Sequence, residues 1–285
     1  MINYNKDEQN IVTLTLDNPN KSANIINLAF GEALKATLER LQAEKDSIRG
    51  IIITSAKETF MAGADIDEMF KETNPQHLFN RAQNLKAGMR YLETQGKPVV
   101  AAINGTALGG GFELTLACHR RIVLDNPKIQ LGLPEVTLGL LPGAGGVTKM
   151  VRLLGLQGAL VYLTEGKKVS PAEALKDGLV HELAKDKEDL LAKAKAWILA
   201  NNTATQPWDN RDYKMPGGSP LNPNVAKVLP IAPAMLAKKT HNNYPAPLAI
   251  MSAAVEGALV DFDTATRIES RYFVQLATGK VSKNM

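Results

Sequence analysis

Two short apolar runs constrain the fold of this chain more than any other feature of its sequence. Residues 50–54 read GIIIT and residues 98–103 read PVVAAI. Such runs are typical of strands in a parallel sheet with helices on both faces, because a solvated face would carry a polar residue at every second position. Apolar residues at helical spacing in 29–47 and 76–95 precede the two runs. We therefore predict an α/β layered architecture.

Shorter signals complete the series of predicted elements. The run 11–16 (IVTLTL) alternates and ends at a turn, which predicts a half-buried strand. Ser170, Pro171 and Glu173 form a capping-box pattern at the start of a helix that Gly178 ends. The other predicted elements are a helix from Leu114 to His119, a strand from Arg121 to Leu124 and a helix that begins near Gly146.

Length and proline content predict the domain organisation. A chain of 285 residues favours one large domain, or one domain with an extension. Eight of the 15 prolines fall between Pro207 and Pro247, so we predict that this stretch wraps or links without regular structure. Residues 248–277 recover helical periodicity. We therefore predict a core over residues 1–200, and a proline-rich segment with a C-terminal helix over residues 201–285.

The composition excludes several classes of protein. The net charge is +4, but the basic residues are spread over the chain and no five of them are consecutive. Aromatic residues, on which bases could stack, make up only 5%. We therefore predict no binding to nucleic acid. Cys118 is the only cysteine, which excludes an internal disulfide and favours a reducing compartment. The first ten residues lack the pattern of a signal peptide, and no apolar stretch reaches about 18 residues. We predict a soluble, cytoplasmic protein without a membrane segment.

Two glycine clusters, GGGFEL (109–114) and GAGGVT (143–148), resemble a dinucleotide-binding motif but do not complete it. Leu114 and Thr148 stand where each pattern requires its last glycine, and neither cluster directly follows a strand. The four histidines are scattered singly, which favours surface or hydrogen-bonded side chains over a metal site. We therefore predict neither a nucleotide cofactor nor a metal ion.

Two loops rich in small residues each lead into a predicted helix. The first, residues 60–66 (FMAGADI), precedes an apparent short helix, and the second, residues 104–113 (NGTALGGGFE), follows the buried run 98–103. Unpaired N–H groups at a helix start attract a negatively charged atom. Because ligands of a parallel sheet bind at the carboxyl ends of its strands, we predict that the two loops supply N–H donors to an oxyanion.

Two glutamates accompany these loops. Glu113 falls on the first turn of the glycine-led helix, and Glu135 follows Pro134 in the run LGLPE. Each has an ordinary alternative role, Glu113 as a charge near a helix N-terminus and Glu135 as a solvated loop residue. Apolar neighbours favour burial of both side chains, and buried carboxyl groups are suited to acid and base catalysis.

The order and spacing of these motifs resemble the crotonase, or enoyl-CoA hydratase/isomerase, superfamily over residues 10–185. Within it, the chain is most similar to the hydratase part of the multifunctional fatty-acid oxidation α subunits, and QPWD (206–209) and NYPAP (243–247) are similar to their connecting stretch. The resemblance implies a crotonase-like ββα superhelix with a helical, proline-rich C-terminal extension. The motifs that carry it are Ala62-Gly63-Ala64-Asp65, Asn104-Gly105, residues 107–113, Pro134-Glu135 and residues 139–146.

The resemblance also implies a reaction and its residues. The reaction is hydration of a trans-2-enoyl-CoA to a 3-hydroxyacyl-CoA in β-oxidation, without a cofactor, since coenzyme A is part of the substrate. The N–H groups of Ala64 and Gly110 are implied to hold the thioester oxygen. Glu113 is implied to be the base and Glu135 the acid. Asp65 has the alternative role of a helix N-cap. The implied contacts of coenzyme A are Ser22, Ala23, Ala62, Asp65 and Ile66.

Other functions stay open. Hydratase/isomerases that carry out both reactions keep both glutamates, so Δ3-Δ2-enoyl-CoA isomerisation is an alternative or a second activity. A non-catalytic docking module of a β-oxidation complex is a further alternative, in which the proline-rich tail and the final helix bind a dehydrogenase or a thiolase. Full-length relatives imply a 3-hydroxyacyl-CoA dehydrogenase domain and a thiolase subunit as partners. Because those relatives continue beyond the position of Met285, we expect this chain to be the hydratase part of a longer protein, with a short natural relative as the alternative.

Overall fold

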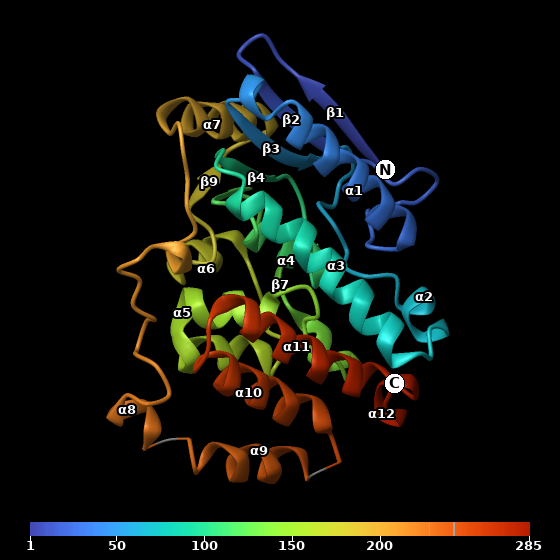
Figure 1. Cartoon of the computed structure of the whole chain (residues 1–285), viewed down its shortest axis with the longest axis vertical. Helices are drawn as coiled ribbons and strands as arrows, with labels where there is room; N and C mark the ends of the chain where they lie inside the picture. The colour runs from blue at the N-terminus through green and yellow to red at the C-terminus, as the bar shows by residue number, and fades with distance from the viewer. Residues whose placement is uncertain (228, 242) are drawn as a thin grey trace. The chain divides into compact units, whose positions relative to one another are not determined.

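The two apolar runs form neighbouring parallel strands at the centre of a six-stranded sheet (Figure 1). The computed structural model describes residues 1–227, 229–241 and 243–285. The strand order is β1-β2-β3-β4-β6-β9, in which β1 runs antiparallel to β2 and the other pairs are parallel. The strands of this sheet are β1 (Ile2–Lys6), β2 (Ile11–Leu16), β3 (Gly50–Ser55), β4 (Val99–Ile103), β6 (Arg120–Leu124) and β9 (Glu182–Ala184).

The described residues divide into two compact units that are discontinuous in sequence. Both units therefore combine segments far apart in the chain, and the division into residues 1–200 and 201–285 remains a prediction. The first unit comprises residues 1–65, 87–132 and 169–206, and the second comprises residues 66–86, 133–168 and 207–285.

In the first unit, helix α7 (Lys187–Ala200) covers one face of the sheet (Figure 1). Leu190, Ala194 and Ile198 recur at helical spacing and pack in one buried cluster with Ile52 of β3. The predicted α/β architecture is confirmed, because a parallel sheet with a helix packed on its face is its defining feature. The other elements are α1 (Leu28–Ala43), η1 (Lys45–Ser47), the second half of α3 (Pro75–Thr94), β5 (Ala107–Leu108), α4 (Gly110–Leu116), β7 (Leu131–Gly132) and α6 (Pro171–Lys176).

The second unit is built mainly from helices. Helix α10 (Pro245–Gly257) packs against both α5 (Gly146–Leu163) and α11 (Phe262–Ala277). Small buried residues such as Ala253 and Ala254 on α10 allow this close approach. The remaining elements are α2 (Ile66–Lys71), the first half of α3, η2 (Pro134–Leu138), η3 (Pro207–Asp209), α8 (Pro223–Ala226), α9 (Ala232–Thr240) and α12 (Lys280–Lys283), while β8 (Lys168–Val169) begins in this unit and ends in the first.

The prediction of irregular structure between Pro207 and Pro247 is wrong for much of that stretch. Helices α8, α9 and α10 each begin with a proline in the first turn. The missing N–H of proline costs nothing there, since the first N–H groups of a helix have no partner within it. Within this stretch, Val228 and Asn242 lie outside the described residues.

Other predicted boundaries also need correction. The helix predicted from Leu114 to His119 is α4, which starts four residues earlier because its glycines pack tightly enough to override their low helix propensity. The periodicity over 248–277 is shared by two helices, the second capped by the side chain of Asp261. The predicted helix 29–47 ends at Ala43, and strand β1 was not predicted.

One local prediction is confirmed in detail. Ser170 caps α6 and accepts a hydrogen bond from the N–H of Glu173, whose carboxylate accepts in turn from the N–H of Ser170. None of the helices in the described ranges is both long and apolar enough to cross a membrane.

Candidate active site

A buried asparagine fixes the first loop at the carboxyl edge of the sheet. Asn24 is 2% exposed, and its Nδ2 donates to the carbonyl of Leu16 (3.2 Å), to Oγ of Ser55 (2.9 Å) and to the carbonyl of Phe60 (3.1 Å). Leu16 and Ser55 are the last residues of β2 and β3. The loop that starts at Phe60 is therefore held where the parallel strands end. No local pattern in the sequence singles out Asn24, because its hydrogen-bond partners lie up to 36 residues away.

Ala64 lies in an extended part of this loop, opposite Ile26. The N–H of Ile26 donates to the carbonyl of Gly63 (2.8 Å), and the N–H of Asp65 donates to the carbonyl of Ile26 (2.9 Å). Successive residues of an extended chain direct their N–H groups to opposite sides. The N–H of Ala64 therefore faces away from Ile26.

The second loop lies directly against the first. The N–H of Leu108 donates to the carbonyl of Met61 (3.1 Å). A Cβ atom at Gly111 would lie 2.4 Å from that same oxygen, so only glycine fits there. Gly110 is the first residue of α4, and its N–H is one of those that a helix leaves without an internal partner.

Glu113 is buried beside the Gly110 backbone. The residue lies on the first turn of α4 and is 2% exposed. A Cβ atom at Gly110 would lie 3.9 Å from Oε2 of Glu113 and 2.6 Å from Cδ1 of Ile26. Because Ile26 is also the bridge partner of Ala64, the first unit brings Ala64, Gly110 and Glu113 into one neighbourhood.

Glu135 belongs to the second unit. It lies in the 3-10 helix η2, is half-buried, and its carbonyl accepts from the N–H of Leu140 (3.1 Å). Gly139 follows η2 in the left-handed conformation, with φ of 72°. The residue is therefore part of a folded turn, and its role as the acid stays a prediction.

The residues implied to contact coenzyme A lie around the first loop. The N–H of Ala62 donates to the carbonyl of Asn24 (2.9 Å), which brings this loop beside the segment 22–24. Partial or full exposure is common to all five residues, and their role as contacts stays a prediction. Ser22 and Ala62 are exposed, Ala23, Asp65 and Ile66 are half-buried, and Ile66 opens α2 in the second unit.

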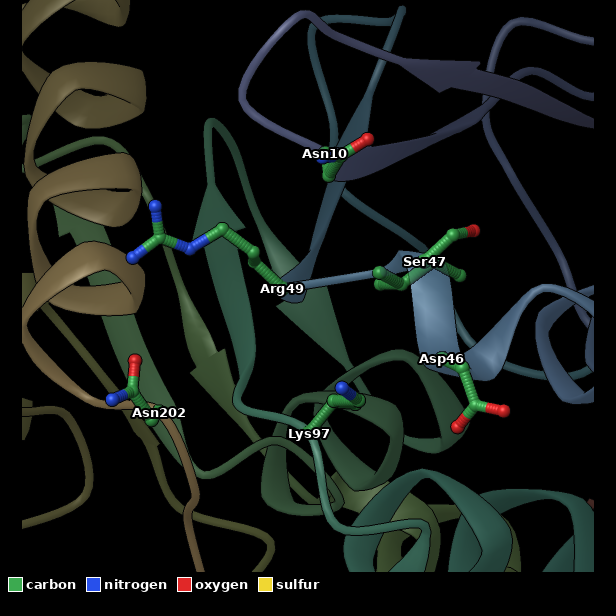
Figure 2. Close-up of a pocket in the computed structure, with 7 residues that line it drawn as sticks. Asn10, Asp46, Ser47, Arg49, Lys97 and Asn202 are labelled. Atoms are coloured by element: carbon green, nitrogen blue, oxygen red, sulfur yellow. The ribbon is translucent and has the colours of Figure 1, made fainter.

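A cavity of about 310 Å³ occupies the opposite edge of the same sheet (Figure 2). Asn10 and Arg49 immediately precede β2 and β3, and Lys97 lies just before β4. The cavity is therefore at the amino ends of the strands, whereas the two loops follow the carboxyl ends. Its remaining lining residues are Asp46, Ser47, Ile48 and Asn202.

Two of the histidines have structural partners in the first unit. Nδ1 of His119 accepts from the N–H of Val99 (3.1 Å), and Nδ1 of His181 accepts from the N–H of Arg121 (3.0 Å). Desolvation of the ring, together with the positive charges of Arg121 and Arg120, lowers the pKa of His181 to about 3. Over the ranges that the structure describes, no three His, Cys, Asp or Glu side chains gather as metal ligands.

Comparison with known proteins identifies relatives of these motifs. A family model described as enoyl-CoA hydratase/isomerase matches residues 6–207. The fatty acid oxidation complex subunit alpha of Shewanella baltica (strain OS185) is 35% identical over 283 residues, which are 99% of this chain and 40% of that protein. That of Shewanella sp. (strain MR-4) is 34% identical over 282 residues, which are 99% of this chain and 39% of that protein. The chain thus spans about two fifths of the length of these curated relatives.

Solved structures resemble the chain over nearly its whole length. An enoyl-CoA hydratase from Bacillus anthracis is 28% identical with a TM-score of 0.63, and the match covers 98% of this chain and 92% of that one. An enoyl-CoA hydratase from Bacillus halodurans, 23% identical with a TM-score of 0.66, covers 100% of this chain and 99% of that one and supports the fold alone.

Proposed function

Because the chain belongs to the enoyl-CoA hydratase/isomerase family, we propose that it hydrates a trans-2-enoyl-CoA to a 3-hydroxyacyl-CoA in fatty-acid β-oxidation. The α/β fold with its C-terminal helical extension is the crotonase fold. The observation that carries the proposal is the buried carboxylate of Glu113 beside the backbone of Gly110, at the start of α4.

In this proposal the two loops form an oxyanion hole. Adding water to a double bond conjugated with a thioester moves negative charge onto the carbonyl oxygen. The N–H groups of Ala64 and Gly110 would donate to that oxygen, and the N-terminal dipole of α4 favours the same charge. Donors held by a folded backbone need no reorganisation when the charge develops, so they lower the barrier more than water would.

The two glutamates carry the proton steps. Glu113 takes a proton from water while the water oxygen bonds to C3, and Glu135 gives a proton to C2 as the enolate collapses. The hydroxyl group at C3 comes from the water, and the cycle closes when Glu113 releases its proton to solvent and Glu135 takes one up, so the net reaction adds one water molecule and consumes no oxidant or reductant. Two carboxyl groups near one water molecule do not both ionise cheaply, which favours one protonated and one ionised member.

A hydration assay tests the proposal directly. Incubation with 2-enoyl-CoA thioesters of several chain lengths should abolish the ultraviolet absorbance of the conjugated thioester and yield 3-hydroxyacyl-CoA. The chain length that gives the highest kcat/KM identifies the preferred substrate. An inactive chain at every length would contradict the proposal and favour a docking module.

The family description also includes isomerases, so a second substrate belongs in the same experiment. Isomerisation moves a proton between C4 and C2 of a 3-enoyl-CoA and consumes no water. A chain that acts only on 3-enoyl-CoA would be an isomerase, and activity on both substrates would indicate a bifunctional enzyme. We also propose partners for this reaction: the 3-hydroxyacyl-CoA product is the substrate of a 3-hydroxyacyl-CoA dehydrogenase domain, and a thiolase subunit would act after it.

A further inference from the structure

A carboxylate from the C-terminal region binds the N-terminus of α5. Glu269 on α11 is fully buried, and its oxygens accept from the N–H of Gly145 (2.8 Å) and from the N–H of Thr148 (2.9 Å). The first N–H groups of a helix lack internal partners and attract negative charge. Glu269 thus acts as the cap of a helix that starts more than 100 residues earlier in the chain.

A buried lysine completes this arrangement. Nζ of Lys86 lies 2.8 Å from Oε1 of Glu269, and the lysine is only 6% exposed. The same ammonium group donates to the carbonyl of Thr266 (2.7 Å) and to Oγ of Ser270 (2.9 Å). Three acceptors match the three hydrogens of an ammonium group, which is the condition under which a buried ion pair is tolerated.

The segment held in this way begins with the proposed acid. We define the carboxylate segment as residues 134–146, which run from η2 with Glu135 to the first residue of α5. Glu269 binds its far end through Gly145. Near Glu135, the N–H of Gly139 donates to Oη of Tyr244 (3.2 Å), and a Cβ atom at Gly139 would lie 3.0 Å from Cα of Ser282.

The middle of the carboxylate segment is also covered by the C-terminal region. A Cβ atom at Gly143 would lie 2.7 Å from the ring of Phe273 on α11. The contacts from Tyr244, Glu269, Phe273 and Ser282 all come from residues beyond 207, where the family model ends. The extension therefore contacts this segment at both ends and in its middle.

We infer that Glu269, held by Lys86, is a positioning residue for Glu135. This inference rests on the proposed function, in which Glu135 delivers the proton to C2. A proton donor must lie within hydrogen-bonding distance of the atom that it protonates, so movement of its segment lowers kcat without weakening the binding of coenzyme A. Glu269 touches no substrate atom in this account and acts only through the carboxylate segment.

The test is the variant Glu269→Gln, which keeps the size of the side chain. A glutamine places one acceptor oxygen and one amide group where the carboxylate has two acceptors, so it cannot satisfy both N–H groups, and it removes the negative charge of Glu269 that faces the Lys86 ammonium group. We expect kcat for 2-enoyl-CoA hydration to fall at least tenfold while KM changes less than twofold. Hydrogen exchange followed by mass spectrometry should show faster exchange in peptides that cover the carboxylate segment and the first turn of α5.

A matched control separates positioning from loss of stability. Glu93 is another buried glutamate with an ion-pair partner, since its Oε2 lies 2.7 Å from Nη1 of Arg90. It belongs to the first unit, whereas the carboxylate segment belongs to the second. Glu93→Gln should lower the melting temperature, yet kcat per folded molecule and exchange over residues 134–146 should stay as in the unmodified chain.

A second variant keeps the inference testable if Glu269→Gln does not fold. Glu269→Asp retains the charge that pairs with Lys86 but is one methylene too short to span both amides, so kcat should fall at least threefold in a folded protein. Unchanged kcat in either folded variant, or unchanged exchange over residues 134–146, would overturn the positioning role. If the unmodified chain has no hydratase activity, the proposed function is overturned. If the unmodified chain and both folded Glu269 variants are equally active, only the positioning role is overturned.

Discussion

At the scale of single residues, the candidate site would use side chains for proton transfer and backbone N–H groups for binding the oxyanion. Glu113 and Glu135 would act through their side chains, whereas Ala64 and Gly110 would act through backbone N–H groups. A side-chain role is tested by an isosteric change that alters only the proton chemistry. A backbone role is tested by a change that moves the donor.

The glutamates provide the first prediction. Glu113→Gln and Glu135→Gln should each lower hydratase kcat by at least about 100-fold, because general acid and base catalysis is worth about 10²- to 10⁴-fold and an amide cannot exchange the proton. Stopped-flow absorbance of a 2-enoyl-CoA gives the rate, and circular dichroism checks the fold. Near-normal turnover in either variant would remove that residue from the mechanism.

Gly110 provides the second prediction. A Cβ atom there would lie 2.6 Å from Cδ1 of Ile26, the end of a flexible side chain, so Gly110→Val can fold if Ile26 moves. We expect kcat/KM to fall at least 100-fold, since losing one oxyanion donor costs on the order of 3 kcal/mol of transition-state stabilisation. Thermal melts accompany the kinetics. A collapsed melting temperature with normal activity per folded molecule would instead make Gly110 a packing residue.

The stability of the chain should depend on His181. Its pKa of about 3 in the folded state lies below the value of about 6.5 for an unperturbed histidine, so the unfolded chain binds more protons in the interval between them. The free energy of unfolding should therefore decrease as the pH falls from about 6.5 toward 3. Denaturant titrations at several pH values measure the slope. In the variant His181→Asn, Oδ1 of the asparagine can accept the same hydrogen bond, and the free energy of unfolding should depend less on pH. An unchanged pH dependence in this variant would assign the effect to other groups.

At the scale of elements, helix starts account for much of the local order. The sequence signal for α6 is a complete capping box, and Ser170→Ala removes the acceptor for the N–H of Glu173. We expect a loss of about 1 kcal/mol in the free energy of unfolding, measured by urea titration, because substitution of an N-cap serine by alanine typically costs that much. Ser170→Gly should cost only a few tenths of that. Equal losses for the two variants would contradict the capping role.

At the scale of the whole molecule, the second glycine cluster, residues 143–148, donates to a group of the protein itself. The N–H groups of Gly145 and Thr148, which sit in the second dinucleotide-like cluster, already donate to Glu269. A pyrophosphate would need such amides for itself. The chain should therefore show no NAD-linked oxidation of 3-hydroxyacyl-CoA and a flat calorimetric titration with NAD. Saturable binding at micromolar NAD would contradict this prediction.

Local patterns in the sequence were sufficient to predict the strand and helix alternation, the capping box at Ser170 and the two small-residue loops. Each depends on neighbours a few residues apart, such as the period of two in β2 or the spacing of Ser170 and Glu173. The motif order was likewise sufficient to identify the family. These features depend on residue types and their spacing along the chain, and not on long-range contacts.

Only the tertiary structure decided which distant groups meet. Asn24 connects β2, β3 and the first loop through hydrogen bonds. Helix α4 starts at Gly110 because Gly111 fits against the backbone of Met61. Glu269 caps α5 although 124 residues separate it from Gly145. A buried polar side chain has no periodic signal of its own, since its free energy depends on partners that only folding supplies. The proline-rich stretch was mispredicted for the same reason: proline excludes helix interiors but not helix starts, and packing decides where a helix starts.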